Sequence, residues 1–187
     1  MTKPKVLLHI CCAPCALFPL KTLREEGFTV YGLWYNPNIH PFAEYRKRRE
    51  SVLKLSEEEG MELIEAGGYP VEEFFRRTAF RENVRCPICY NMRLEQTAAV
   101  ARKGAFDFFT TTLLYSKFQN HQEISDQGEA AAQKYRQTFL YRDFRPGWSS
   151  GIEESKRRGF YRQQYCGCLY SEKERYRNEI EIKKEEI

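Results

Sequence analysis

The sequence lacks any long apolar run, since none of its hydrophobic stretches approaches the roughly 18 residues of a membrane-spanning helix. Residues 6–10 form a short apolar run with no small-residue cleavage site after them, which argues against a signal peptide. The glycine-rich loops that hold nucleotide phosphates are also missing. We therefore expect a cytoplasmic protein with no membrane partner and no conventionally bound flavin, nicotinamide or ATP.

Internal repeats, low-complexity segments and interdomain linkers are likewise absent from the 187 residues. A chain of this length suits one domain with a core of its own, so we expect a single α/β domain over residues 1–187. Hydrophobic residues make up 42% and charged residues 30%, a composition typical of globular proteins.

Short apolar runs alternate with longer segments of helical spacing along most of the chain. This alternation predicts a parallel sheet with helices on both faces, and a site beyond the carboxyl ends of its strands. The expected strands are residues 6–10, 28–35, 62–66, 106–112 and a short 137–141, and the expected helices are residues 16–26, 42–59, 71–80, 88–103 and 122–135. Residues 142–151 read as irregular, and 171–187 as a charged C-terminal helix.

The chemistry-bearing residues are seven cysteines in three groups: Cys11, Cys12 and Cys15, then Cys86 and Cys89, then Cys166 and Cys168. A disulfide framework does not suit a cytoplasmic chain with an odd number of cysteines. A structural zinc site remains an alternative, because two of these groups could supply four thiolates. Buried structural thiols are a weaker alternative, since every cysteine belongs to a group.

A structural zinc site uses four thiolates, and this chain has seven grouped cysteines. This surplus favours a redox cluster over zinc. Thiolate ligation with Cys-x-x-Cys spacing suits a 4Fe–4S cluster, which four cysteines hold. We select Cys86 and Cys89 with Cys11 and Cys12 as ligands, although spacing alone does not decide which four of the first five cysteines bind. Cys166 and Cys168 flank one glycine and are predicted to form a redox-active pair that cycles between dithiol and strained disulfide.

Candidate substrate-binding residues follow the second expected strand. His40 lies in a loop at the carboxyl edge of the sheet, where function is common. The next helix begins with an aromatic residue and arginines, which could stack on bases and bind phosphates; these are Tyr45, Arg46, Arg48 and Arg49. Trp148 is a further stacking candidate, whereas His9 is expected to be a core residue.

Four motifs together resemble the QueH family of epoxyqueuosine reductases. They are His9-Ile10-Cys11-Cys12-Ala13-Pro14-Cys15, Tyr35-Asn36-Pro37-Asn38-Ile39-His40-Pro41, Cys86-Pro87-Ile88-Cys89 with Met92-Arg93, and Phe160-Tyr161-Arg162-Gln163-Gln164-Tyr165-Cys166-Gly167-Cys168. The motifs run from residue 9 to residue 168 in the family's order. Gln164 departs from the family pattern, in which glutamate is frequent at this position.

The resemblance implies the last step of queuosine biosynthesis, the two-electron reduction of epoxyqueuosine at the wobble position of tRNA. It implies a 4Fe–4S cluster without cobalamin, a second mononuclear metal (iron) nearby with unassigned ligands, and an external electron donor. It also implies a fold similar to the adenine-nucleotide α-hydrolase (HUP/Rossmann-like) type, with cysteines replacing the nucleotide loop. The alternatives from the residues alone are a structural-zinc nucleic-acid-binding module and an iron–sulfur or thiol electron-transfer protein without tRNA.

Overall fold

A four-stranded parallel sheet forms the centre of the computed structural model, which describes residues 2–182. The strands are β1 (Lys5–His9), β2 (Thr29–Trp34), β3 (Leu63–Glu65) and β4 (Phe108–Thr111). Their order is β3-β2-β1-β4, so the chain starts in the middle of the sheet, builds one half and then crosses to the other. The parallel sheet predicted from the alternating pattern is confirmed.

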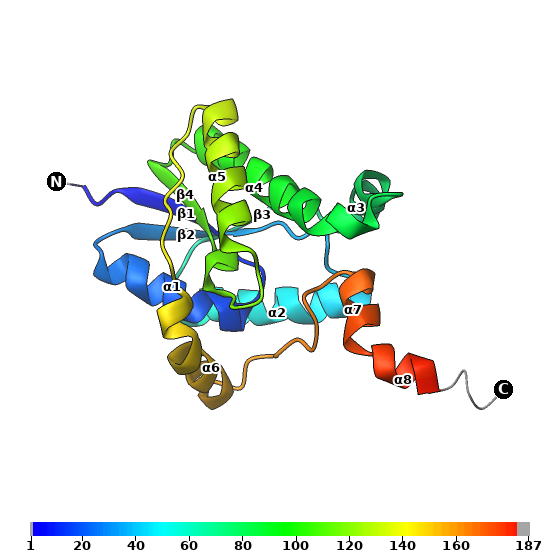
Figure 1. Ribbon diagram of the computed structural model, residues 1–187. Coiled ribbons are helices and arrows are strands. Elements are labelled where there is room, and N and C mark those ends of the chain that lie inside the picture. The colour runs from blue at the N-terminus through cyan, green and yellow to red at the C-terminus, as the bar shows by residue number, and fades with distance from the viewer. Residues whose placement is uncertain (1, 183–187) are drawn as a thin grey trace.

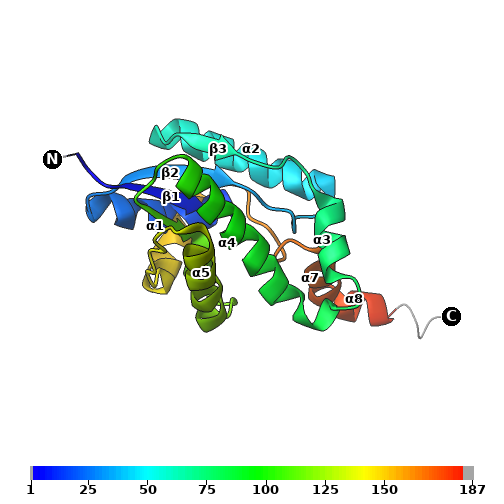
Figure 2. The same cartoon turned by 90° about the horizontal axis from the view of Figure 1, so that it is seen from above.

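Helices cover both faces of the sheet, as predicted. Figure 1 shows α1 and α2 on one side of the strands, and α4 with α5 on the other. Figure 2 shows the same layers from above, with α3 and α7 together at one end. The helices are α1 (Ala13–Glu25), α2 (Phe42–Glu59), α3 (Val71–Thr78), α4 (Arg85–Lys103), α5 (His121–Tyr135), α6 (Trp148–Arg157), α7 (Leu169–Arg175) and α8 (Arg177–Ile182), and short 3-10 turns occupy Glu82–Val84, Thr112–Tyr115 and Arg145–Gly147.

β1 is central because its side chains are apolar on both faces. Val6, Leu7 and Leu8 are completely buried, which is typical of a parallel strand with a helical layer on each side. β1 pairs with β2 through Leu7–Tyr31 and with β4 through Leu7–Phe109. The carboxyl end of β1 therefore lies between its neighbours, and the residues that follow it enter the middle of one sheet edge.

Local signals explain where the helices begin and end. α2 ends at Gly60, whose φ of 57° is left-handed and accessible to glycine. Asn120 caps α5, because its side chain accepts a hydrogen bond from the Glu123 N–H. α1 has a proline in its first turn, where no backbone hydrogen bond is lost.

Three expectations for the second half of the chain are wrong. The short strand expected at 137–141 is a single bridge between Phe109 and Phe139, because the segment touches the edge of β4 and turns away. Residues 142–151 are not irregular throughout, since α6 already begins at Trp148. The expected 171–187 helix is two short helices separated at Tyr176, and its last five residues lie outside the described part of the chain.

None of the helices within residues 2–182 combines the length and the apolar character needed to cross a membrane.

Candidate metal and redox site

The loop after β1 gathers three cysteines at the carboxyl edge of the sheet. The Sγ atoms of Cys11, Cys12 and Cys15 all lie within 4.8 Å of one another. Cys12 is the extended residue before α1, and Cys15 lies in the first turn of that helix. The short spacing and the helix start therefore point three sulfurs at one place, which we call the cysteine triad.

The triad shares its protons unequally. Hydrogen bonds from Cys12 and Cys15 are the main cause of a lowered pKa at Cys11, and Thr112 adds a further bond at 3.2 Å. Burial raises the pKa of Cys12, whereas bonding to Cys11 and Cys12 raises the pKa of Cys15. Three sulfurs at this range, one of them with a lowered pKa, form a donor set that suits a soft metal ion or cluster.

His9 lies directly before the triad and is fully buried. Its Nδ1 lies 2.9 Å from the Thr111 hydroxyl, and its Nε2 lies 3.1 Å from the Tyr35 carbonyl oxygen. Burial lowers its pKa to about 4, and the positive charge of Arg93 acts in the same direction. The expected core role of His9 is confirmed.

The second cysteine group lies in the first two turns of α4. This helix begins at Arg85, three residues before the expected start, so Cys86 and Cys89 are both helical. Cys89 is buried and packs with Phe74, Met92 and Cys168. Burial raises the pKa of Cys89 to about 12, and the neighbouring Cys166 and Cys168 add to the effect.

The third cysteine group lies on residues 160–168, which run between α6 and α7 and which we call the cysteine strap (Figure 1). Buried Arg48 of α2 holds this segment, since its guanidinium donates to the carbonyl oxygens of Tyr165 at 3.0 Å and Cys166 at 2.8 Å. Glu44 pairs with Arg48 at 2.7 Å and accepts a bond from the Tyr161 hydroxyl.

A second set of bonds holds the strap against the loop after β2. The His40 N–H donates to the Gly167 carbonyl oxygen at 2.8 Å, and the Tyr165 hydroxyl donates to the His40 carbonyl oxygen at 2.6 Å. Gly167 has a φ of 154°, and a Cβ there would lie 2.9 Å from Asn38 Nδ2. The glycine between Cys166 and Cys168 is therefore required by close packing as well as by backbone conformation.

A cavity of about 330 Å³ opens beside the triad and the strap. Cys11, Cys15 and Cys166 line it, so sulfurs from two distant segments face the same space. Glutamine amides contact the sulfurs around it: Gln163 Nε2 lies 3.1 Å from Cys12 Sγ, and Gln119 Nε2 lies 3.5 Å from Cys166 Sγ. This sulfur-lined cavity is the candidate reaction chamber.

Aromatic side chains form the outer rim of the sulfur-lined cavity. Trp148 stacks on Tyr115 with ring centroids 5.1 Å apart, and Phe118 meets Trp148 edge-on at 5.7 Å. Phe118 is 84% exposed although it is a large apolar residue. Lys117 Nζ lies 5.8 Å above the Trp148 ring, and Arg162 also lines the cavity.

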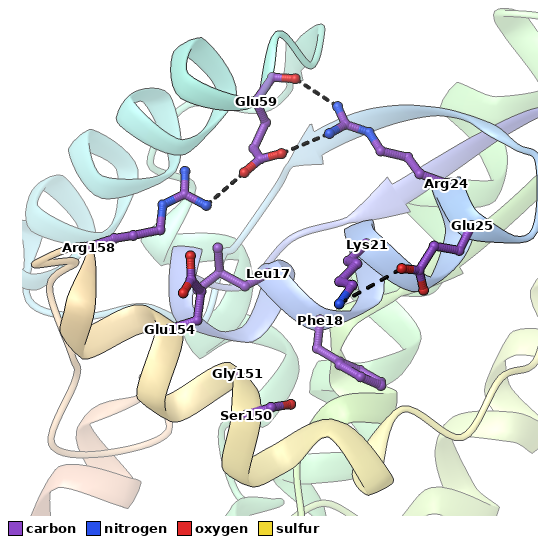
Figure 3. Close-up of a pocket in the computed structure, with 10 residues that line it drawn as sticks. All are labelled: Leu17, Phe18, Lys21, Arg24, Glu25, Glu59, Ser150, Gly151, Glu154 and Arg158. Carbon is purple, nitrogen blue, oxygen red and sulfur yellow. Dashed lines mark hydrogen bonds and ion pairs between the residues drawn. The ribbon is translucent and has the colours of Figure 1, made fainter.

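A larger cavity of about 570 Å³ lies between α1, the end of α2 and α6, and no cysteine lines it (Figure 3). Most of the charges on its wall are already paired. Arg24 and Arg158 both bind Glu59 at 2.8 and 2.7 Å, and Lys21 pairs with Glu25 in the same view. With its charges satisfied and no reactive group present, this cavity is a weaker candidate site.

Several residues expected to bind substrate are buried and occupied by other partners. His40 stacks on Phe75 with ring centroids 4.8 Å apart, and its Nε2 lies 2.9 Å from the Pro37 carbonyl oxygen. Tyr45 bonds Trp34 Nε1 at 2.7 Å and the Gly68 carbonyl oxygen at 2.6 Å. These two residues and Arg48 are buried, and they contact the protein segments that surround the site.

The remaining two arginines of that cluster are on the surface. Arg46 is exposed and lies 3.8 Å from Glu50. Arg49 donates from Nη2 to Glu65 at 2.7 Å, and this bond raises the pKa of Arg49. Arg46 and Arg49 differ from Arg48 because the helical spacing points Arg48 toward the strap and the other two arginines toward solvent.

The four predicted metal ligands are only partly gathered. Cys11 and Cys12 lie together, but the third close sulfur is Cys15, which the prediction left out. Within residues 2–182 the triad is the one group of three metal-binding side chains at such short range. Cys86 and Cys89 lie instead beside Cys166 and Cys168, with which they interact electrostatically.

Three residues of the site, Arg93, Thr112 and Gln119, were not among the predicted site residues, although Arg93 stands in one of the family motifs. Arg93 stands one helical turn after Cys89, a spacing that could have indicated proximity to the cysteines. Thr112 and Gln119 carry no such signal. The parallel pairing of β1 with β4 brings Thr112 to the triad, and Gln119 contacts Cys166 of the strap.

A solved structure confirms the fold type. The described chain superposes with a TM-score of 0.53 on the crystal structure of a predicted subunit of tRNA methyltransferase from Methanocaldococcus jannaschii, covering 82% of this chain and 74% of that one. The two sequences are 10% identical, so the likeness concerns the fold alone. The shared fold is the parallel sheet covered by helices on both faces.

Sequence relatives match almost the whole chain. A protein of Dehalococcoides mccartyi named epoxyqueuosine reductase QueH is 44% identical over 92% of this chain and 95% of its own length. The equally named protein of Thermotoga maritima is 38% identical over 95% of both chains. The family model described as epoxyqueuosine reductase QueH matches residues 6–174, which include all seven cysteines. The chain belongs to the epoxyqueuosine reductase QueH family.

Proposed function

We propose that the protein reduces epoxyqueuosine to queuosine at the wobble position of tRNA, the last step of queuosine biosynthesis. The observation that carries this proposal is the sulfur-lined cavity, which places thiols of the triad and the strap around one space at the carboxyl edge of the sheet. The proposed substrate and the reduced thiols both suit the cytoplasm, where disulfides are rare.

The donor set fits a 4Fe–4S cluster. Three sulfurs within 4.8 Å of one another, with no carboxylate or imidazole in the group, match the thiolate ligation such clusters prefer. We propose Cys11 and Cys12 from the loop after β1, with Cys86 and Cys89 from α4, as the ligands. A second, mononuclear iron near the cluster is part of the same proposal, and its ligands stay unassigned. When bound, the cluster supplies single electrons.

Cys166 and Cys168 are proposed as the redox-active pair. Cys166 lines the sulfur-lined cavity, whereas Cys168 packs beside Cys89, so the pair connects the substrate side with the metal side. Oxidation of the dithiol to a disulfide releases two electrons and two protons. The epoxide accepts them, both of its C–O bonds break, a carbon–carbon double bond forms and the oxygen leaves as water. An external electron donor then restores the dithiol, without cobalamin.

The protein residues around the cavity position the substrate and exclude water. Gln119 and Gln163 offer amide groups within the cavity wall, and Arg48 fixes the strap that carries Cys166. The anticodon loop of tRNA presents unstacked bases, which single-stranded RNA-binding proteins receive on aromatic side chains. Exposed Phe118 and half-buried Trp148 are aromatic residues at the rim, so we propose them, with Lys117 and Arg162, as the site of the anticodon bases.

Anaerobic reaction of the iron-loaded protein with tRNA carrying epoxyqueuosine, followed by mass analysis of the nucleosides, tests the proposal. Conversion to queuosine with a chemical reductant is expected. Loss of conversion in Cys166→Ser, with the iron retained, would identify Cys166 and Cys168 as the redox-active pair. A colourless protein with one tightly held zinc would support a structural-zinc module instead. An iron-loaded protein that does not bind tRNA would support an electron-transfer protein.

A further inference from the structure

Arg93 is a fully buried arginine without an anionic partner. It lies on α4 one turn after Cys89 and is 2% exposed. Its Nε donates a 3.3 Å hydrogen bond to the Cys89 carbonyl oxygen, and its Nη2 is buried with no partner. Across residues 2–180, whose side chains the structure describes, no carboxylate pairs with it.

The other fully buried arginine shows how unusual this is. Arg48 is 1% exposed, but it is neutralised by Glu44 at 2.7 Å and donates to two carbonyl oxygens. A buried guanidinium without such an anion costs several kcal/mol, so proteins retain one where an anion is bound. Arg93 therefore indicates an anion-binding position.

Cysteine sulfurs lie among the groups around Arg93. Arg93 lines the sulfur-lined cavity together with Cys11, Cys15 and Cys166. Its charge interacts with Cys89, Cys166 and Cys11, which belong to all three cysteine groups. The anion that this arginine faces must therefore be one that the cysteines themselves hold.

We propose that Arg93 is the counter-cation of the cysteine centre and binds the negatively charged, thiolate-ligated metal group that the centre takes up. Thiolates and sulfides outweigh the iron charges in such a group, so its assembly next to a fixed positive charge is favoured. The same charge favours the electron-rich state and raises the reduction potential. This inference rests on the proposed metal–thiolate centre, but it does not depend on tRNA or on the epoxide.

The proposal predicts opposite effects of one substitution on the metal-free and the loaded protein. Arg93→Met removes a buried, unpaired charge from the metal-free chain and should leave it as stable as the parent or more stable. In the iron-loaded protein the same change removes a charge-assisted contact. Loss of one such contact should speed iron loss to a chelator by roughly ten- to a hundredfold.

The experiment reconstitutes the full chain anaerobically with ferrous iron and sulfide. It measures thermal unfolding before loading, iron release to a chelator after loading, and the reduction potential. Arg93→Lys keeps the charge and should stay close to the parent in all three measurements. Arg102→Met, on the exposed side of the same helix, controls for the loss of any α4 arginine. Arg93→Met should show unchanged or higher thermal stability before loading, faster iron release and a more negative potential.

Two results would overturn the inference. One is an Arg93→Met protein that unfolds earlier, or fails to fold, before loading, because the arginine would then be a structural element. The other is a loaded Arg93→Met protein with the iron retention and potential of the parent. If the parent takes up no iron, the proposed cluster fails along with the inference. If the parent is loaded but does not reduce epoxyqueuosine, only the proposed reaction fails.

Discussion

Arg48 shows at the scale of one side chain how the fold places its cysteines. It is far from the strap in sequence, yet one guanidinium joins the start of α2 to the carbonyl oxygens of Tyr165 and Cys166. Because Glu44 compensates the charge, this contact is both buried and specific. The orientation of the redox pair therefore depends on a residue that does not touch either sulfur.

Replacement of Arg48 with methionine should strongly destabilise the protein. The change leaves Glu44 buried without its cation and two carbonyl oxygens without donors, which typically costs about 3–5 kcal/mol. Arg46→Met is the matched control on the same helix. Since Arg46 is exposed, its loss should change the free energy of unfolding by less than about 0.5 kcal/mol. Urea unfolding measures both, and equal effects would contradict a special role for Arg48.

His40 should make the stability sensitive to acid. Burial lowers its pKa below the ordinary 6.5, so the folded state resists protonation that the unfolded state accepts. The contribution is complete above about pH 6.5 and is lost as the pH falls, by at most about 1.4 kcal/mol per pH unit. The ring lies among the aromatic side chains of Phe74, Phe75 and Tyr69.

Comparison of the parent with His40→Gln isolates this effect, because His9 titrates in both proteins. The glutamine keeps an amide donor in place of Nε2 but does not titrate. Its unfolding free energy should decline less steeply between about pH 6.5 and pH 5. If the unfolding free energies of the two proteins fall in parallel with pH, His40 has the same pKa in the folded and the unfolded state.

At the scale of elements, the strap is the segment on which the site depends most. Gly167→Ala should displace it, since the new Cβ would lie 2.9 Å from Asn38 Nδ2 and 3.2 Å from Ile39 Cγ1. Strain at such positions costs about 1–3 kcal/mol. Gly159→Ala is the control, because Gly159 also has a positive φ but no atom lies within 4 Å of its Cβ. Alkylation of Cys166 and Cys168, followed by mass spectrometry, should change in the first variant alone.

The helix α4 supplies the cysteines whose ligand role is least constrained by the geometry. Cys86→Ser and Cys89→Ser should each lose iron, since a hydroxyl is a poor ligand for a soft metal. Cys166→Ser and Cys168→Ser should retain iron and lose turnover. Iron analysis of Cys15→Ser completes the comparison. Iron loss there with retention in Cys86→Ser would assign the triad, rather than the α4 pair, as the principal ligand set.

At the scale of the whole molecule, two surfaces compete for the phosphates of tRNA. One is the cavity rim with Lys117 and Arg162, and the other is the outer face of α2 with Arg46 and Arg49. The α2 arginines already pair with Glu50 and Glu65, which leaves them less free for phosphate. We therefore expect tRNA to depend mainly on the rim.

Two double variants of equal charge test this expectation. Lys117→Ala with Arg162→Ala should weaken tRNA binding and reduce its log–log salt slope by up to about 1.4, at roughly 0.7 per contact. Arg46→Ala with Arg49→Ala should have a clearly smaller effect. A larger change of the salt slope in the second variant would show that the α2 arginines bind the phosphates. Binding titrations over a range of salt concentrations give the result.

Much of this architecture could be predicted from the sequence, because it depends on signals between residues that are close together in the chain. The four strands, the parallel sheet and α2 over Phe42–Glu59 follow from apolar runs, glycine caps and alternation. The position of the cysteines at the carboxyl edge follows from topology. The roles of Arg48 and His40 could not be predicted, because whether an arginine faces solvent or a distant carbonyl depends on tertiary packing. The split of the helix over 171–187 likewise leaves no periodic signal.

The position of the strap in the sequence also determines when, during synthesis, the site can form. Cys11, Cys12 and Cys15 leave the ribosome first, but the segment that closes over them is about 150 residues later. At roughly 5–20 residues per second, about 8–30 s of synthesis separate the triad from the strap that later contacts it. Because the site needs groups from the strap, it cannot be complete before Cys168 has been synthesised. Each molecule therefore becomes competent only after the strap has folded against the triad.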